Sequence, residues 1–237
     1  MIDWTGEHGL QIGRTVVRDQ HLLRGTWLLV LLTAITSMTT HLLSGNARAI
    51  PFFISESDYP GPERILFTGG FTIAGLLFCA LSMRLAHTFE TAVGQKQSQL
   101  SKWFGVVTGV SLICVAWFNM HDQIIIHSIF AMVTFIGGYG WSCSTHLAIS
   151  NTLSPGHVRR KAWMIVGAVS FAVMNLSLAK AVRTHVIDAG LRDSAEIMNL
   201  SQNSITFAAP AEYVLFLSLV MMLASFEHDI ALSKQQE

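Results

Sequence analysis

Three polar side chains from distant parts of the chain have the types needed for acyl transfer. Ser55 offers a hydroxyl nucleophile, His127 a base for its proton, and Glu212 a carboxylate that can orient the imidazole. Such sets catalyse acyl transfer in unrelated folds. No nucleophile elbow or other strict catalytic motif accompanies them. We therefore keep a second interpretation, in which these groups hydrogen-bond the backbone of an irregular loop, and we prefer it.

Two further carboxylates lie in and after the segment that carries Ser55. Glu56 follows Ser55 directly, and Glu63 follows Pro62 at a helix start. Proline suits the first turn of a helix, and a glutamate there complements the positive end of the helix dipole. Glu63 thus also has a purely structural explanation. His121, Asp122 and His127 match no strict zinc spacing, so we expect no metal site and no cofactor.

The composition indicates the setting in which these groups lie. The chain has 237 residues, of which 51% are hydrophobic and 13% are charged, and its 15 basic and 15 acidic side chains cancel. Soluble domains carry about 25% charged residues, so this chain has too few to cover a surface that faces water. Nucleic acid is excluded as a partner because phosphate binding needs a clustered excess of Lys and Arg.

Six apolar runs are each long enough to cross a bilayer, which takes roughly 20 residues. We predict an all-α integral membrane protein, a six-transmembrane-helix bundle that forms a single domain over 1–237. The predicted spans are about 26–43, 65–86, 103–120, 124–149, 162–181 and 208–226. Gly105 and Gly109 in the third run permit close helix packing, which we assign to contacts inside the bundle.

The distribution of basic residues predicts the orientation. With the N-terminus inside, ten of the 15 Lys and Arg residues fall in inner segments, as the positive-inside rule requires. We therefore expect both termini to be cytoplasmic. The sequon Asn199-Leu200-Ser201 then lies on the outer side. This topology also predicts an outer-face polar cluster, made of Ser55, Glu56, Glu63, His127 and Glu212.

Several short motifs resemble those of the DRAM family, the damage-regulated autophagy modulators. The segment Ile54-Ser55-Glu56-Ser57-Asp58, followed by Pro62-Glu63 and Leu66-Phe67, is similar to the first-loop signature of that family. Phe118 to His127 resembles a second motif, Glu212-Tyr213 a third, and Phe226 with Asp229 a closing aromatic-x-x-Asp. The chain has Glu56, Ser57 and Asp58 where the family has Asp, Thr and Gly. The resemblance extends over all six predicted spans.

The resemblance implies a role in membrane-lipid or endomembrane homeostasis, because relatives include autophagy modulators, proteins of GPI-anchor lipid remodelling and yeast plasma-membrane regulators. Our first expectation is a non-catalytic protein that binds membrane lipid or another membrane protein through the outer cluster. An acyl-transfer enzyme that uses Ser55, His127 and Glu212 is the second, and a structural subunit of a larger membrane complex is the third. The expected location is an endomembrane (lysosome or Golgi) or the plasma membrane.

Overall fold

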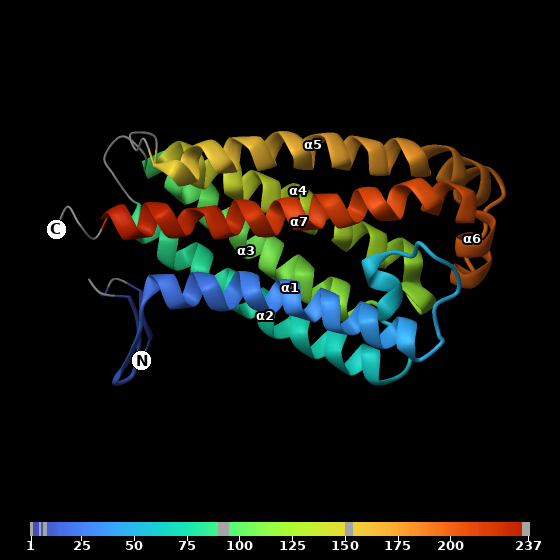
Figure 1. The fold of residues 1–237 in the computed structure, drawn as a ribbon, viewed down its shortest axis with the longest axis horizontal. Coiled ribbons are helices and arrows are strands. Elements are labelled where there is room, and N and C mark those ends of the chain that lie inside the picture. The colour runs from blue at the N-terminus through green and yellow to red at the C-terminus, as the bar shows by residue number, and fades with distance from the viewer. Residues whose placement is uncertain (1, 5, 7–8, 90–94, 150–153, 234–237) are drawn as a thin grey trace.

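The computed structural model describes residues 2–4, 6, 9–89, 95–149 and 154–233. In these residues the chain forms a bundle of long helices, together with one short helix and a small sheet (Figure 1). The helices are α1 (Asp19–Leu43), α2 (Pro62–Thr88), α3 (Gln95–Trp117), α4 (Met120–Ala148), α5 (Pro155–Ala181), α6 (Ser194–Leu200) and α7 (Gln202–Ser233). All but α6 are long and apolar enough to cross a membrane, which makes six candidate spans in the described part of the chain.

Local sequence explains where several helices begin. Pro62 and Pro155 stand in the first turns of α2 and α5, where a missing N–H costs no hydrogen bond. Asn119 caps α4, since its side-chain oxygen accepts the N–H of Asp122 at 2.7 Å. This cap also corrects the predicted third span, which runs through Met120 in the sequence. The helix α3 ends at Trp117, and Met120 already belongs to α4.

The long helices pack as neighbours in a fixed order. The helix α5 lies along α7, α1 contacts both α7 and α2, α2 lies along α3, and α3 lies along α4. Glycine allows the closest of these approaches. A Cβ on Gly109 of α3 would lie 2.4 Å from Sγ of Cys79 and 2.6 Å from the carbonyl oxygen of Gly75, both in α2. The predicted glycine contacts therefore occur inside the bundle.

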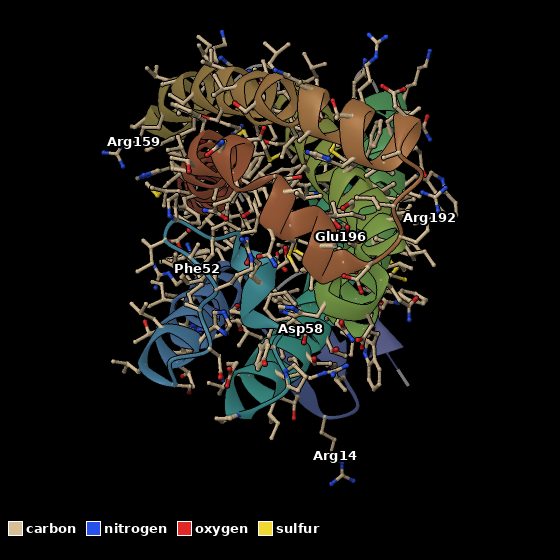
Figure 2. The ribbon with its side chains drawn as sticks, turned by 90° about the vertical axis from the view of Figure 1, so that its right-hand side faces the viewer. Arg14, Phe52, Asp58, Arg159, Arg192 and Glu196 are labelled. Atoms are coloured by element: carbon tan, nitrogen blue, oxygen red, sulfur yellow. The ribbon has the colours of Figure 1, made fainter. Side chains whose placement is uncertain are left out.

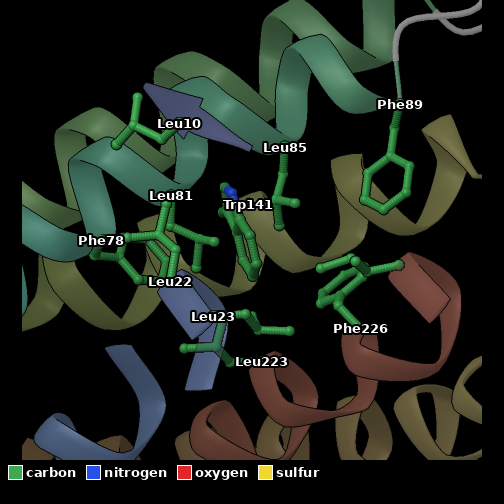
Figure 3. Close-up of a cluster of buried hydrophobic side chains, with 11 residues drawn as sticks. Leu10, Leu22, Leu23, Phe78, Leu81, Leu85, Phe89, Trp141, Leu223 and Phe226 are labelled. Carbon is green, nitrogen blue, oxygen red and sulfur yellow. The ribbon is translucent and has the colours of Figure 1, made fainter. Parts of the chain in front are cut away.

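A three-stranded antiparallel sheet precedes the first helix and was not predicted from the sequence. Its strands are β1 (Ile2–Asp3), β2 (Leu10–Ile12) and β3 (Thr15–Val17). Leu10 pairs with Val17 and is buried against the helices. Figure 3 shows Leu10 among the buried side chains of this core, with Trp141 at the centre and Phe226 beside it. We call this end of the bundle, where the sheet meets the last turns of α7, the terminal end.

The opposite end is closed by segments that the sequence predicted less well. The proline-rich segment between α1 and α2, treated in the sequence as an irregular loop, contains the 3-10 helix η1 (Ile54–Ser57). Its prolines flank the turn rather than interrupt it. Between α5 and α7 the chain forms a π-helical segment η2 (Val182–Asp188) and then α6. Figure 2 looks onto this end, which we call the η1 end.

Candidate functional site

The helix η1 is held at its end of the bundle by a buried glutamate. Glu56 accepts the backbone N–H of Phe53 at 3.0 Å, which satisfies a donor at the start of the turn. Its other oxygen accepts from the guanidinium of Arg48 at 3.1 Å. His121, in the first turn of α4, bonds the carbonyl oxygen of Glu56 at 3.0 Å. Glu56 therefore caps the start of η1 and joins it to Arg48 in the preceding loop.

The helix α7 supplies a second set of bonds to η1 and to the residues just before it. Glu212 is buried, and its Oε2 accepts the backbone N–H of Ile54 at 2.8 Å. The hydroxyl of the next residue, Tyr213, donates to the carbonyl oxygen of Phe52. The helix α7 thus satisfies one backbone N–H, that of Ile54, and one backbone carbonyl, that of Phe52. Without these partners, two backbone groups would be buried and unpaired inside an apolar bundle.

His127 lies in α4 and is almost fully buried, with 2% of its surface exposed. Its Nδ1 lies 2.7 Å from the carbonyl oxygen of Phe118. A carbonyl oxygen only accepts, so Nδ1 carries the proton and donates it. Nε2 has no hydrogen-bond partner among the described residues. The neutral imidazole therefore keeps an unused lone pair on Nε2.

Two other acidic residues of the η1 end have separate partners. Glu63 in the first turn of α2 accepts from the amide of Asn46 at 2.7 Å and contacts Nδ1 of His41 at 3.3 Å. Asp58 follows η1 and is fully buried, with Arg64 at 3.7 Å and the hydroxyl of Thr68 at 3.4 Å. Burial raises the pKa of Asp58 to about 7, although the charge of Arg64 and the bond from Thr68 oppose this shift.

The structure brings Ser55, His127 and Glu212 to the wall of one cavity, yet in the described part of the chain no hydrogen bond joins any two of them. The hydroxyl of Ser55 donates to the sulfur of Met120 at 3.5 Å. His127 and Glu212 are bonded to backbone groups, as described above. The three candidates thus share a location, while the remaining cluster members Glu56 and Glu63 bond elsewhere.

This cavity lies between the helices of the bundle. It measures about 120 Å³, and its wall includes residues of α1, η1, α2, α3, α4 and α7. Most of the wall is apolar, with Phe67 and Phe71 on α2 meeting edge to face at 4.7 Å. Along α4 the wall extends from His127 to Ser142, which is roughly 22 Å of helix rise. The polar side chains of η1 and α7 that line this cavity, Ser55 and Glu212, lie at its η1 end.

The terminal end contains a second polar network, which the sequence did not predict. Arg160 of α5 is fully buried and donates to Asp229 of α7, to Ser225 at 3.0 Å and to Nδ1 of His146 at 3.2 Å. Its guanidinium also lies 3.6 Å from the ring centre of Phe226. In the sequence, Arg160 counted only as one of the basic residues of the inner segments, which indicate the orientation of the chain. The spacing of Phe226 and Asp229 was the available signal for this network.

Arg84 makes a comparable network beside the N-terminal sheet. It donates to both carboxylate oxygens of Asp19, at 2.7 and 3.2 Å, and to the backbone carbonyl groups of Trp4 and Gly6. Such forked pairing is the geometry in which arginine binds carboxylates most strongly. Within the described residues, no three His, Cys, Asp or Glu side chains lie together as metal ligands would.

Six long apolar helices in the described residues indicate an integral, multi-pass helical membrane protein. The chain belongs to the family described as the Frag1/DRAM/Sfk1/Cwh43P N-terminal domain, whose model matches residues 23–232. The resemblance to the DRAM family is thereby confirmed. No curated protein and no solved structure gives a significant match to the chain.

Proposed function

We propose that the chain is a non-catalytic membrane protein that binds a membrane lipid inside its helix bundle and acts in membrane-lipid or endomembrane homeostasis. The observation that carries this proposal is the cavity in the bundle, whose wall is mostly apolar and contains Ser55, His127 and Glu212 at the η1 end. Ligand sites are typically concave and apolar, with a few convergent polar groups. The autophagy and GPI-lipid roles of similar proteins agree with a lipid ligand.

The membrane setting favours a lipid as the occupant of this cavity. The helices that line it are candidate spans, so acyl chains surround them on the outside. An apolar cavity excludes water unless polar groups hold it, and an alkyl chain restores the van der Waals contacts that an empty space lacks. The polar end then receives the part of the lipid that must form hydrogen bonds.

The hydrogen bonds at the η1 end support a binding role over a catalytic one. Glu212 bonds the N–H of Ile54 instead of the imidazole of His127, and Ser55 donates to Met120. A general base must lie within hydrogen-bond reach of the proton that it removes. In this arrangement the carboxylate holds the η1 loop in place, whereas the imidazole bonds the carbonyl of Phe118 between α3 and α4. The loop contributes Ile54 and Ser55 to one end of the cavity.

Acyl transfer is the second candidate, because the same cavity wall contains Ser55, His127 and Glu212 and because Nε2 of His127 has a free lone pair. In that reaction Ser55 attacks a lipid ester while Nε2 takes its proton. The lipid alcohol then leaves with the proton, and the acyl group stays on Ser55. Loss of activity in a normally folded His127→Ala variant would favour this candidate. A variant that misfolds would favour the structural role instead.

We also propose that both ends of the chain face the cytoplasm. The sheet near the N-terminus and the last turns of α7 lie at the same end of the bundle (Figure 1). The excess of basic residues in the segments of that end supports a cytoplasmic position. Labelling of single engineered cysteines at Arg14 and Arg192 in sealed cells tests the proposal. Only the cysteine at Arg192 is expected to react with an impermeant reagent.

Filling the cavity tests the lipid-binding proposal. A Cβ on Gly138 would make ordinary contacts of 3.5 Å with Leu219 and 3.7 Å with Thr108, so Gly138→Leu places its remaining atoms in the cavity. Gly69 in α2 is exposed and has no heavy atom within 4 Å of such a Cβ, so Gly69→Leu is the matched control. Mass spectrometry of the purified, folded proteins should show bound lipid in the control and at least tenfold less in Gly138→Leu. Equal lipid content in both variants would refute the proposal.

A further inference from the structure

The chemistry of the ligand, given the lipid-binding function proposed above, is constrained by Nε2 of His127. This buried atom has no hydrogen-bond partner among the described residues. Because Nδ1 donates to the carbonyl of Phe118, Nε2 of the neutral ring can only accept a hydrogen bond. A buried acceptor left unpaired destabilises the protein, because the atom has lost its bond to water and gained none in return. A ligand that brings a donor to this atom therefore gains more than one that does not.

The charges around the cavity limit what the donor can be. None of the described residues that line it is Lys or Arg, and its one acidic lining residue is Glu212. A phosphate or a carboxylate would enter this space without a cation to pair with, which is strongly unfavourable in an apolar interior. An ammonium group could donate, but it too would lose its hydration. A neutral hydroxyl satisfies Nε2 without placing a further charge there.

The dimensions of the cavity limit the apolar part of the ligand. Its volume of about 120 Å³ is close to the roughly 150 Å³ of an apolar protein cavity known to take up benzene. The wall nevertheless extends along α4 from His127 to Ser142. A space that is long for its volume accommodates one extended alkyl chain better than a ring system or two chains side by side.

Two other unpartnered polar atoms lie deeper along the same wall. They are Nε1 of Trp141 and the hydroxyl oxygen of Ser142. The indole N–H of Trp141 only donates. It therefore cannot distinguish an alcohol from an ether, since the oxygen atoms of both accept hydrogen bonds. A preference for alcohol over ether thus reports on an acceptor. At the polar end of the cavity, Nε2 of His127 is the buried acceptor that has no partner among the described residues.

We propose that the cavity binds a neutral, single-chain amphiphile whose hydroxyl group donates a hydrogen bond to Nε2 of His127. The hydroxyl lies beneath η1, next to Ser55 and Glu212. The alkyl chain extends along α4 toward Trp141. The residues that line the cavity contain no partner for an anionic headgroup, so acidic lipids are rejected from this site.

Three matched photoreactive probes test this assignment on the full-length protein in detergent. The probes are octanol with a diazirine in its chain, the methyl ether of the same compound, and the corresponding octanoate. After irradiation, mass spectrometry of peptides from α4 and α7 measures labelling. We expect the alcohol to label these peptides about tenfold more than the ether or the octanoate, as one buried hydrogen bond allows. Gly138→Leu should abolish this labelling, whereas Gly69→Leu should leave it unchanged.

The outcomes separate this inference from the proposed function. Equal labelling by alcohol and ether, blocked by Gly138→Leu, would overturn the hydroxyl assignment and leave lipid binding intact. Absence of labelling in the cavity by all three probes would overturn both. In His127→Phe the alcohol should fall to the level of the ether, while Ser142→Ala should retain the preference. Because the probe comparison uses the unchanged protein, it decides the question even if His127→Phe does not fold.

Discussion

Replacing Asp229 by alanine should strongly destabilise the protein. Asp229 is the carboxylate partner of Arg160, and both side chains are 1% exposed. Removing one member of a buried pair leaves the other charge in an apolar interior, at a cost of about 3–5 kcal/mol. Arg160 keeps its bonds to Ser225 and His146, but neither of these neutralises the guanidinium as a carboxylate does.

The structure offers a matched control at the opposite end of the bundle. Asp188 pairs with Arg183 at 3.9 Å, and these side chains are 60% and 80% exposed. An exposed pair contributes about 0–1 kcal/mol, so Asp188→Ala should change stability very little. Thermal unfolding in detergent measures both variants. With about 2–4 °C per kcal/mol for a chain of this size, Asp229→Ala should lower the midpoint by about 10 °C.

A double variant identifies the origin of the loss. Arg160→Met combined with Asp229→Leu removes both charges and fills the space with apolar side chains, so it should recover most of the stability lost in Asp229→Ala. Fluorescence of Trp141, measured in proteins whose other five tryptophans are replaced by phenylalanine, provides a local signal, because its ring lies 5.1 Å from that of Phe226, which Arg160 also contacts. Equal melting temperatures of Asp229→Ala and Asp188→Ala would refute this explanation. A double variant as unstable as the single one would assign the loss to packing instead of charge.

Two further predictions concern the loop and the helix interface. Burial holds the pKa of Asp58 at about 7 in the folded protein, above its ordinary value of 3.8, so the native state binds the extra proton. The stability that this group contributes is complete below pH 3.8 and is lost as the pH rises through 7. The melting temperature of the unchanged protein should therefore fall between pH 4.5 and pH 7.5, and it should fall less in Asp58→Asn. Gly109→Ala should lower the melting temperature by several degrees, because its Cβ would lie 2.4 Å from Cys79 and overlap it. The same substitution at Gly25, where nothing lies within 4 Å, should have little effect, and equal melting of these two variants would contradict the close contact of α2 with α3.

The hydropathy of the sequence was sufficient to predict the membrane class and the six long helices. A span must be apolar over its whole length because the bilayer satisfies no backbone group, so each span is visible in the order of residues alone. Helix starts at Pro62 and Pro155 are equally local, since they depend on the missing N–H of proline. The N-terminal strands were missed because their burial depends on the distant residues Arg84 and Leu85.

The residues of the candidate site were visible in the sequence, whereas their partners were not. Ser55, His127 and Glu212 come from three separate segments, and their types alone allowed both a catalytic set and a structural one. Only the folded chain shows that Glu212 bonds the N–H of Ile54 and that His127 bonds the carbonyl of Phe118. A carboxylate in a sequence has no preferred partner until packing brings one within about 3 Å of it.

The basic residues show the same division between local and tertiary information. Their number and positions along the chain predicted which segments lie together on one side, because that preference acts on each residue during insertion. Arg160 looked like one member of such a signal, and tertiary structure gave it a different role. With α5 packed along α7, its guanidinium is removed from water and must be paired, and Asp229 is the side chain that this packing places beside it.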